Sequence, residues 1–180
     1  ARTASHSSSS GVGSIAGVAR SGGSAVGTAR REPARWWSIA FRDAIRLHPG
    51  AADVRCALAE ALRGAGREDE AIDAYHAALN LDPNNVAALN NLGNALVARE
   101  RPDEGIAALE RALSLQPDAA AVHNNLGSAL TAAARYQDAV AVLRRAIELQ
   151  PDLAGAHMNL GNALYALRQL VDAEQSFRSA

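Results

Sequence analysis

The sequence has one cysteine, few aromatic residues and almost no net charge. Cys56 is the only cysteine among 180 residues, which excludes an internal disulfide and leaves both a reducing cytosol and a cysteine-poor secreted protein open. We interpret Cys56 as a small wall residue, because no base or cation beside it in the sequence would activate its thiol. The formal net charge is -1, so the positive field that draws proteins onto nucleic acid is missing and we expect no nucleic-acid partner.

Long apolar runs are missing as well. A membrane-spanning helix needs about 20 predominantly apolar residues in succession, and no stretch of this sequence approaches that length. We therefore expect a soluble protein that has no membrane partner. Our expectation for its location is cytoplasmic.

The N-terminal segment lacks the residues that build a core. Residues 1–31 contain no acidic residue and no leucine, and Ser, Gly, Ala and Arg dominate them. Such a segment cannot bury enough apolar surface to offset its chain entropy, so we expect residues 1–33 to be a disordered linker or an expression-derived leader. An organelle transit segment shares the Arg- and Ser-rich character, but this stretch has no amphipathic period and no initiator Met.

The rest of the chain is organised by a repeat. Prolines recur 34 residues apart, at Pro49, Pro83, Pro117 and Pro151. If each unit ends two residues after its proline, repeats 1, 2 and 3 span 52–85, 86–119 and 120–153, and repeat 4 covers 154–180. The recurring columns are Leu58, Leu92, Leu126 and Leu160 at place 7, Ala59, Gly93, Gly127 and Gly161 at place 8, and Tyr75, Leu109, Leu143 and Phe177 at place 24. These columns predict an array of one supersecondary unit that acts as a single elongated domain.

Two helices fit each unit. The apolar residues are spaced as on one helical face, and each repeat proline stops the second helix from running on. The expected pairs are 52–65 with 68–81, 86–98 with 102–115, 120–133 with 136–149, and 154–167 with a helix from residue 170 onward. The sequence thus predicts an all-α solenoid of antiparallel helix pairs.

Both ends of the array are expected to differ from the complete repeats. Residues 34–51 fit half a repeat, whose Trp36, Trp37 and Phe41 would cover the open apolar end of the stack. The alternative is that these aromatic residues form a platform for a partner. The sequence stops at Ala180, inside an expected helix, so we expect either a fragment or an end face that another subunit covers.

Three runs of the sequence carry a resemblance. They are LNNLGNAL at 89–96, HNNLGSAL at 123–130 and HMNLGNAL at 157–164. With the small, large and proline columns, they resemble the tetratricopeptide repeat family, and most of all the repeat regions of O-GlcNAc transferase-like and bacterial proteins. The resemblance implies a right-handed superhelix. Place 4, which is often Trp in the family, departs from the pattern because it holds Arg55, Leu89, His123 and His157.

Nothing in the pattern predicts catalysis, because the ionisable residues follow the repeat and do not converge. His123 and His157 occupy the same column in neighbouring repeats, roughly 10 Å apart by the usual helix spacing, whereas zinc needs each nitrogen about 2 Å away. Most acidic residues lie at expected helix starts, which they stabilise. The glycines lie inside helices and lack a following GK[ST]. We expect no enzyme, no catalytic residue, no metal and no cofactor.

The resemblance implies a concave face lined by places 2, 5, 6, 9 and 12 of each first helix. The candidate binding residues there are Asn90, Asn91, Asn94, Val97, Asn124, Asn125, Ser128, Thr131, Met158, Asn159, Asn162 and Tyr165, and repeat 1 carries Asp53, Cys56, Glu60 and Arg63 instead. Asn91, Asn125 and Asn159 form a ladder whose amides could pair with both the N–H and the C=O of an extended peptide. The alternative is that these amides bond to their own backbone or to water.

Magnitudes limit what such a ladder contributes. Three amides at about 1 kcal/mol each supply less than the roughly 4 to 15 kcal/mol lost as freedom of motion on association. Val97, Met158 and Tyr165, or further repeats, must therefore contribute most of any tight binding.

Two branches of the family imply different partners. The carboxylate clamp of chaperone-tail binders needs basic residues at places that here hold Asn90, Ala121 and Asn125, although Asn94 and Asn125 could supply its Asn roles. An acidic tail is therefore disfavoured. We expect a non-catalytic interaction module that binds an extended peptide in an Asn-lined groove. The alternatives are a substrate-recruiting arm of an O-GlcNAc transferase-like glycosyltransferase, and self-association through the helix around Phe177.

Overall fold

The structure is a computed structural model that describes residues 43–47 and 50–180. All of them belong to one unit of the chain. The expected linker at 1–33 and the aromatic residues Trp36, Trp37 and Phe41 lie outside the described residues. Residues 43–47, within the expected half repeat, are helical.

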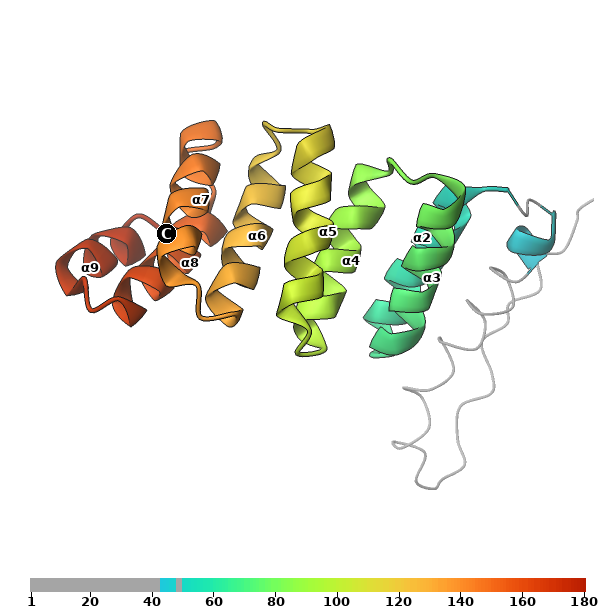
Figure 1. Ribbon diagram of the computed structural model, residues 1–180, viewed down its shortest axis with the longest axis horizontal. Helices are drawn as coiled ribbons and strands as arrows, with labels where there is room; N and C mark the ends of the chain where they lie inside the picture. The colour runs from blue at the N-terminus through green and yellow to red at the C-terminus, as the bar shows by residue number, and fades with distance from the viewer. Residues whose placement is uncertain (1–42, 48–49) are drawn as a thin grey trace, which may run out of the picture. The chain divides into compact units, whose positions relative to one another are not determined.

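The described part of the chain contains helices and no strand. The helices are α2 (Ala52–Gly64), α3 (Glu68–Leu81), α4 (Val86–Ala98), α5 (Pro102–Leu115), α6 (Ala120–Ala132), α7 (Tyr136–Leu149), α8 (Ala154–Ala166) and α9 (Leu170–Arg178) (Figure 1). Each repeat thus holds one pair, with α2, α4, α6 and α8 as first helices and α3, α5, α7 and α9 as second helices. The bounds agree with those expected to within one residue.

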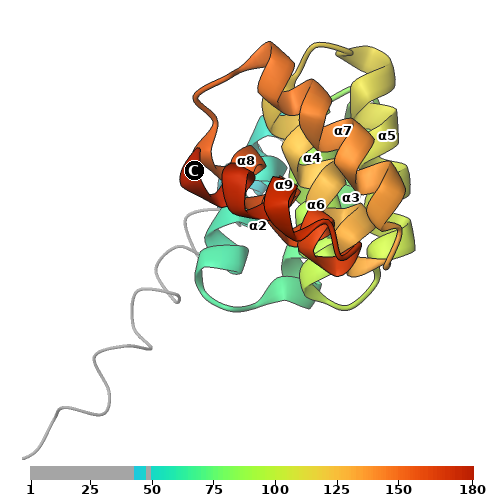
Figure 2. The same ribbon diagram turned by 90° about the vertical axis from the view of Figure 1, so that its left-hand side faces the viewer.

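Each helix packs on the next one along the chain, so the pairs stack in sequence order. Figure 2 views this stack from the α9 end. The first helices also contact one another across repeats, α4 with α6 and α6 with α8. This arrangement places equivalent side chains of successive first helices next to each other.

The core lies between the two helices of each repeat and continues between neighbouring repeats. Tyr75, Leu109 and Leu143 at place 24 are fully buried, and they pack against the small residues at place 8. A Cβ on Gly93 would lie 2.6 Å from Leu109 Cγ, closer than real Cβ contacts come. The small column therefore exists because a large side chain from the facing helix occupies its space.

Local chemistry fixes the helix ends. Acidic residues occupy the first turns of α3, α5, α7 and α9, and Pro102 begins α5 without the loss of a backbone hydrogen bond. The Asn85 side chain caps α4 by accepting from the Ala88 N–H at 2.9 Å. After each first helix the chain turns through a residue with positive φ, which is Gly66 in repeat 1 and Ala134, with φ of 59°, in repeat 3.

Repeat 4 differs from repeats 1 to 3 at place 24. Phe177 is 39% exposed, whereas its equivalents Tyr75, Leu109 and Leu143 are 0% exposed. In repeats 1 to 3 the next first helix packs beside this side chain, and no described helix does so beyond α9. The expected first helices were also one residue too long at Ala65, Ala133 and Leu167, which are C-cap residues.

Membrane insertion has a length requirement that the described helices do not meet. None of them combines the length and the apolar content that a bilayer-crossing helix needs.

Candidate functional site

The candidate residues lie on one surface, here named the first-helix face. It consists of Asn90, Asn91, Asn94 and Val97 of α4, Asn124, Asn125, Ser128 and Thr131 of α6, and Met158, Asn159, Asn162 and Tyr165 of α8. None of these residues is buried. Met158 and Tyr165 are 50% and 62% exposed. The surface is therefore accessible from solvent along three consecutive repeats.

Asparagine side chains bridge neighbouring repeats on this face. Asn159 Nδ2 of α8 donates to Asn124 Oδ1 of α6 at 2.9 Å. Asn125 Nδ2 of α6 donates in the same way to Asn90 Oδ1 of α4 at 2.8 Å. Place 6 of one repeat thus bonds to place 5 of the repeat before it.

Weaker bonds within each repeat join these bridges into one series. Asn124 donates to Asn125 and Asn90 donates to Asn91, each at 3.4 Å. The series ends where Asn91 Nδ2 donates to the Glu60 carboxylate of α2 at 3.0 Å. Each amide donates to the next member on the way from α8 to α2, so the consecutive hydrogen bonds polarise one another. We name these five bonded amides and Glu60 the amide series.

The structure shows a pairing that the two sequence-based alternatives did not include. Asn91, Asn125 and Asn159 bond to neighbouring side chains and not to their own backbone. A primary amide has two N–H donors and two acceptor lone pairs, so each of the three keeps capacity for a ligand. Sequence reasoning missed the bridging role of Asn90 and Asn124. The signal was present, because the Asn-Asn pair at places 5 and 6 recurs after 34 residues.

Charge is distributed unevenly over the first helices. The helices α4, α6 and α8 contain no Asp, Glu, Lys or Arg. In contrast, α2 carries exposed Asp53, Glu60 and Arg63 at places that belong to this face in the other repeats. Three of the four first helices therefore present only neutral amide, hydroxyl and apolar groups on this face. Their two histidines, His123 and His157, form hydrogen bonds elsewhere.

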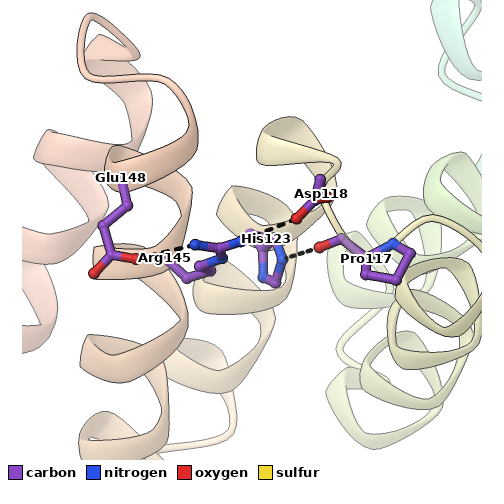
Figure 3. Close-up of polar contacts among 5 residues, drawn as sticks. All are labelled: Pro117, Asp118, His123, Arg145 and Glu148. Atoms are coloured by element: carbon purple, nitrogen blue, oxygen red, sulfur yellow. Dashed lines mark hydrogen bonds and ion pairs between the residues drawn. The ribbon is translucent and has the colours of Figure 1, made fainter.

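Those two histidines hold the first helices to the preceding turns. Nε2 of His123 hydrogen-bonds the Pro117 carbonyl oxygen at 2.8 Å, and Nε2 of His157 bonds the Pro151 carbonyl at the same distance. Both rings are half-buried. Figure 3 shows the contact of His123 with Pro117.

Arginine 145 adds a second link between repeats in the same region. Its guanidinium donates to Asp118 of the preceding turn at 2.9 Å and to Glu148 of its own helix at 3.2 Å (Figure 3). These hydrogen bonds raise the pKa of Arg145, so it stays charged. Arg145 thus pairs with Asp118 and Glu148, neither of which belongs to the first-helix face.

Cys56 lies half-buried at place 5 of repeat 1. Burial raises the pKa of its thiol, and the nearby carboxylates of Asp53, Glu60 and Asp82 raise it further. A thiol held in its protonated form is a poor nucleophile. This agrees with the interpretation of Cys56 as a wall residue.

Metal ligation has no candidate in the part of the chain that the structure describes. No three or more His, Cys, Asp or Glu side chains there are grouped so that they could hold an ion.

Comparisons with known proteins identify the repeat. A family model described as "Tetratricopeptide repeat" matches residues 90–154 and 132–180, more than half of the chain. A second one, "TPR repeat", matches residues 60–99. No curated protein sequence matches this chain.

Solved structures of similar fold include three with about a quarter of their residues identical. PilW, described as a widely conserved type IV pilus biogenesis factor, has a TM-score of 0.75 at 25% identity, over 83% of this chain and 70% of its own. PilF of Pseudomonas aeruginosa has a TM-score of 0.72 at 25% identity, over 86% and 70%. YrrB, described as a TPR protein with an unusual peptide-binding site, has a TM-score of 0.66 at 26% identity, over 78% and 72%. On the repeat matches and the helix-pair stack, the chain belongs to the tetratricopeptide repeat family, as a right-handed all-α solenoid that serves protein–protein interaction.

Proposed function

We propose that the first-helix face is a groove that binds an extended peptide segment of a partner protein. The observation that carries the proposal is the amide series, which runs without a break from α8 to α2 across helices free of charged residues in repeats 2 to 4. A surface of this kind suits the neutral N–H and C=O groups of a peptide backbone.

The stacking supports a hollow on this side. The first helices α4, α6 and α8 contact one another in succession, whereas the second helices α3, α5 and α7 make no comparable contact among themselves within the described residues. An array whose first helices lie closer together than its second helices curves toward the first helices. Such curvature gives repeat proteins their concave binding surfaces.

The remaining amide capacity supports backbone recognition. The bonds of the amide series already fix the orientation of Asn91 and Asn125, so a ligand orders fewer side chains when it binds. Asn94 and Asn162 lie outside the series and add two more amides. Val97, Met158 and Tyr165 supply the apolar area that the amides lack, at roughly 25 cal/mol for each Å² removed from water. YrrB, whose printed description includes a peptide-binding site, is one of the structural relatives.

The test places a cation in the middle of the groove. Ser128 is exposed and makes no hydrogen bond in the described structure, so Ser128→Arg leaves the amide series intact while it fills the face. Ala141→Arg, at an exposed site on α7, is the matched control. The probes are synthetic 12-residue peptides, acetylated and amidated, that the parent protein selects from a random display library.

Calorimetric titration should show that Ser128→Arg weakens peptide binding at least about tenfold, while Ala141→Arg binds as the parent does. Equal affinities for both variants, or a library from which the parent selects no peptide, would remove the groove from consideration.

A second proposal concerns self-association through the end of the array. Leu170, Val171 and Phe177 of α9 are exposed apolar residues. Leu170 and Phe177, together with Tyr165, line a hollow of ≈ 380 Å³. The equivalent surface of repeats 1 to 3 is covered by the next helix pair. Light-scattering mass should rise with concentration, and Val171→Asp should abolish the rise; a constant monomer mass in the parent argues against it.

Other expectations stay predictions. No observation favours the glycosyltransferase arm, which concerns a longer chain than this one. The absence of enzymatic activity and the cytoplasmic location likewise rest on the sequence alone.

A further inference from the structure

The amide series begins in repeat 4, which lacks the Asn-Asn pair of repeats 2 and 3. In repeats 2 and 3 the oxygen of the place-6 asparagine accepts from the Asn at place 5, as in the 3.4 Å bond from Asn124 to Asn125. Place 5 of repeat 4 is Met158, which has no hydrogen-bond donor in its side chain. Asn159 therefore donates to Asn124 at 2.9 Å but accepts from no group in the described structure.

The two ends of the series consequently differ in chemistry. At α2 the last N–H is taken up by the Glu60 carboxylate. At α8 the open group is Asn159 Oδ1. The Asn159 amide donates at the start of a row of hydrogen bonds, which increases the negative partial charge on this oxygen. The groove therefore lacks a donor at one specific place, next to α8.

The surroundings of this acceptor are apolar. Met158 and Tyr165 are seven residues apart on α8, so they project from the same side of the helix two turns apart. Both side chains are at least half exposed. Asn162, also exposed, lies between them. A ligand group that reaches Asn159 Oδ1 must pass beside an unoccupied apolar surface.

We infer that the α8 end of the groove is a specificity subsite, in which Asn159 Oδ1 accepts an amide N–H of the bound peptide while a neighbouring apolar side chain of that peptide packs on Met158 and Tyr165. This inference rests on the proposed function. Repeats 2 and 3 show which group suits the acceptor, because there the amide N–H of the place-5 asparagine donates to the oxygen of the place-6 asparagine. A carboxylate is excluded at this point, since two acceptors would face each other and α8 holds no cation.

The decisive variant gives repeat 4 the asparagine that it lacks at place 5. Met158→Asn restores the Asn-Asn pair of repeats 2 and 3, so the new amide donates to Asn159 Oδ1 and closes the acceptor. Met158→Ala removes the apolar contact and leaves the acceptor open, and Met158→Leu keeps both features. Because the side chain is half exposed, the three variants should fold alike, which thermal unfolding checks.

The measurement uses the peptides that the parent selects from the 12-residue library. Affinity should follow the order parent and Met158→Leu, then Met158→Ala, then Met158→Asn, with the last about tenfold weaker than Met158→Ala. In spectra of the free proteins, the Asn159 side-chain amide should shift in Met158→Asn and not in Met158→Leu. Equal affinities of Met158→Asn and Met158→Ala would overturn the inference.

The N–H that Asn159 Oδ1 accepts can come from the backbone of the peptide or from one of its side-chain amides, and two series of modified peptides distinguish these sources. Methylation of one backbone nitrogen at a time should reveal a single sensitive position if the donor is a backbone N–H. Replacement of each Asn or Gln of the peptide by Leu should reveal it if the donor is a side-chain amide. Loss of affinity in neither series contradicts the subsite.

The outcome also separates this inference from the groove itself. If Ser128→Arg abolishes binding while the Met158 variants bind alike, the groove stands and the subsite falls. If Ser128→Arg has no effect, the proposed groove falls and the subsite with it.

Discussion

The core between paired helices and the first-helix face differ in how closely the repeats agree. In the core, place 8 is always Ala or Gly and place 24 is always large. On the face, place 9 holds Glu60, Asn94, Ser128 and Asn162, and place 12 holds Arg63, Val97, Thr131 and Tyr165. Close packing leaves the core few solutions, whereas exposed positions tolerate many residues. Stability should therefore depend on the first set of positions and partner choice on the second.

The strongest test of this difference substitutes one residue of each kind in α6. Leu126 is 5% exposed, so Leu126→Ala should lower the free energy of unfolding by about 2 to 5 kcal/mol through lost burial and a cavity. Thr131 is half-buried on the face, and its hydroxyl donates only to the Gly127 carbonyl of its own helix, so Thr131→Ala should cost less than about 0.5 kcal/mol. Urea unfolding measures both. Similar costs would contradict the division between core and face.

Overpacking tests the same core from the other side. A Cβ on Gly127 would overlap the Leu143 side chain. Gly127→Ala should therefore destabilise the array by about 1 to 3 kcal/mol, although alanine favours helices. Gly155→Ala is the control, because that site on α8 leaves room for a methyl group. If Gly127→Ala is as stable as Gly155→Ala, the tight contact between α6 and α7 is wrong.

Tyr75 is the one polar side chain in the place-24 column. It is fully buried, and its hydroxyl has no hydrogen-bond partner. Burial raises the pKa of Tyr75 to about 12, against about 10 for an unfolded tyrosine. The folded chain therefore keeps the proton longer, so this contribution to stability is complete below about pH 10 and is lost as the pH rises toward 12.

Tyr75→Phe should remove that alkaline loss and raise stability near neutral pH by about 1 kcal/mol, because no unpaired hydroxyl is buried. Thermal unfolding between pH 9 and about 12 measures it. Tyr165→Phe, at an exposed site, provides the matched control and should leave the pH profile unchanged. An equally steep alkaline loss in parent and Tyr75→Phe would assign that loss to other groups.

A smaller effect is expected in the turn after α6. Ala134 has a φ of 59°, in the left-handed region that favours glycine, and Gly66 occupies the equivalent place in repeat 1. Ala134→Gly should stabilise the chain by about 0.5 to 1 kcal/mol, since relief of strain outweighs the added freedom of the unfolded chain. Ala132→Gly, inside the last turn of α6, should have the opposite sign. Two destabilised variants would contradict the turn geometry.

The sequence predicted the helix pairs well because their ends depend on local chemistry. Proline at place 32, acidic first turns and the small column are all readable without coordinates. The amide bonds were not readable, since Asn125 reaches Asn90 only when α6 and α4 have a particular offset along their axes. The exposure of Phe177 was not readable from its column either, because the same large residue is covered or exposed according to what packs beside it.

The uniform direction of the amide series makes the array extensible. A second copy of residues 86–119 placed after the first would supply Asn at both places 5 and 6, so a longer protein would keep an unbroken row that still terminates on Glu60. A copy of residues 154–180 at the same position would end the amide series there, because the methionine at place 5 has no amide to accept one hydrogen bond and donate the next. The length of the amide series therefore depends on how many consecutive repeats carry Asn at both places 5 and 6. The series ends at Glu60 on one side and at the first repeat without this Asn-Asn pair on the other.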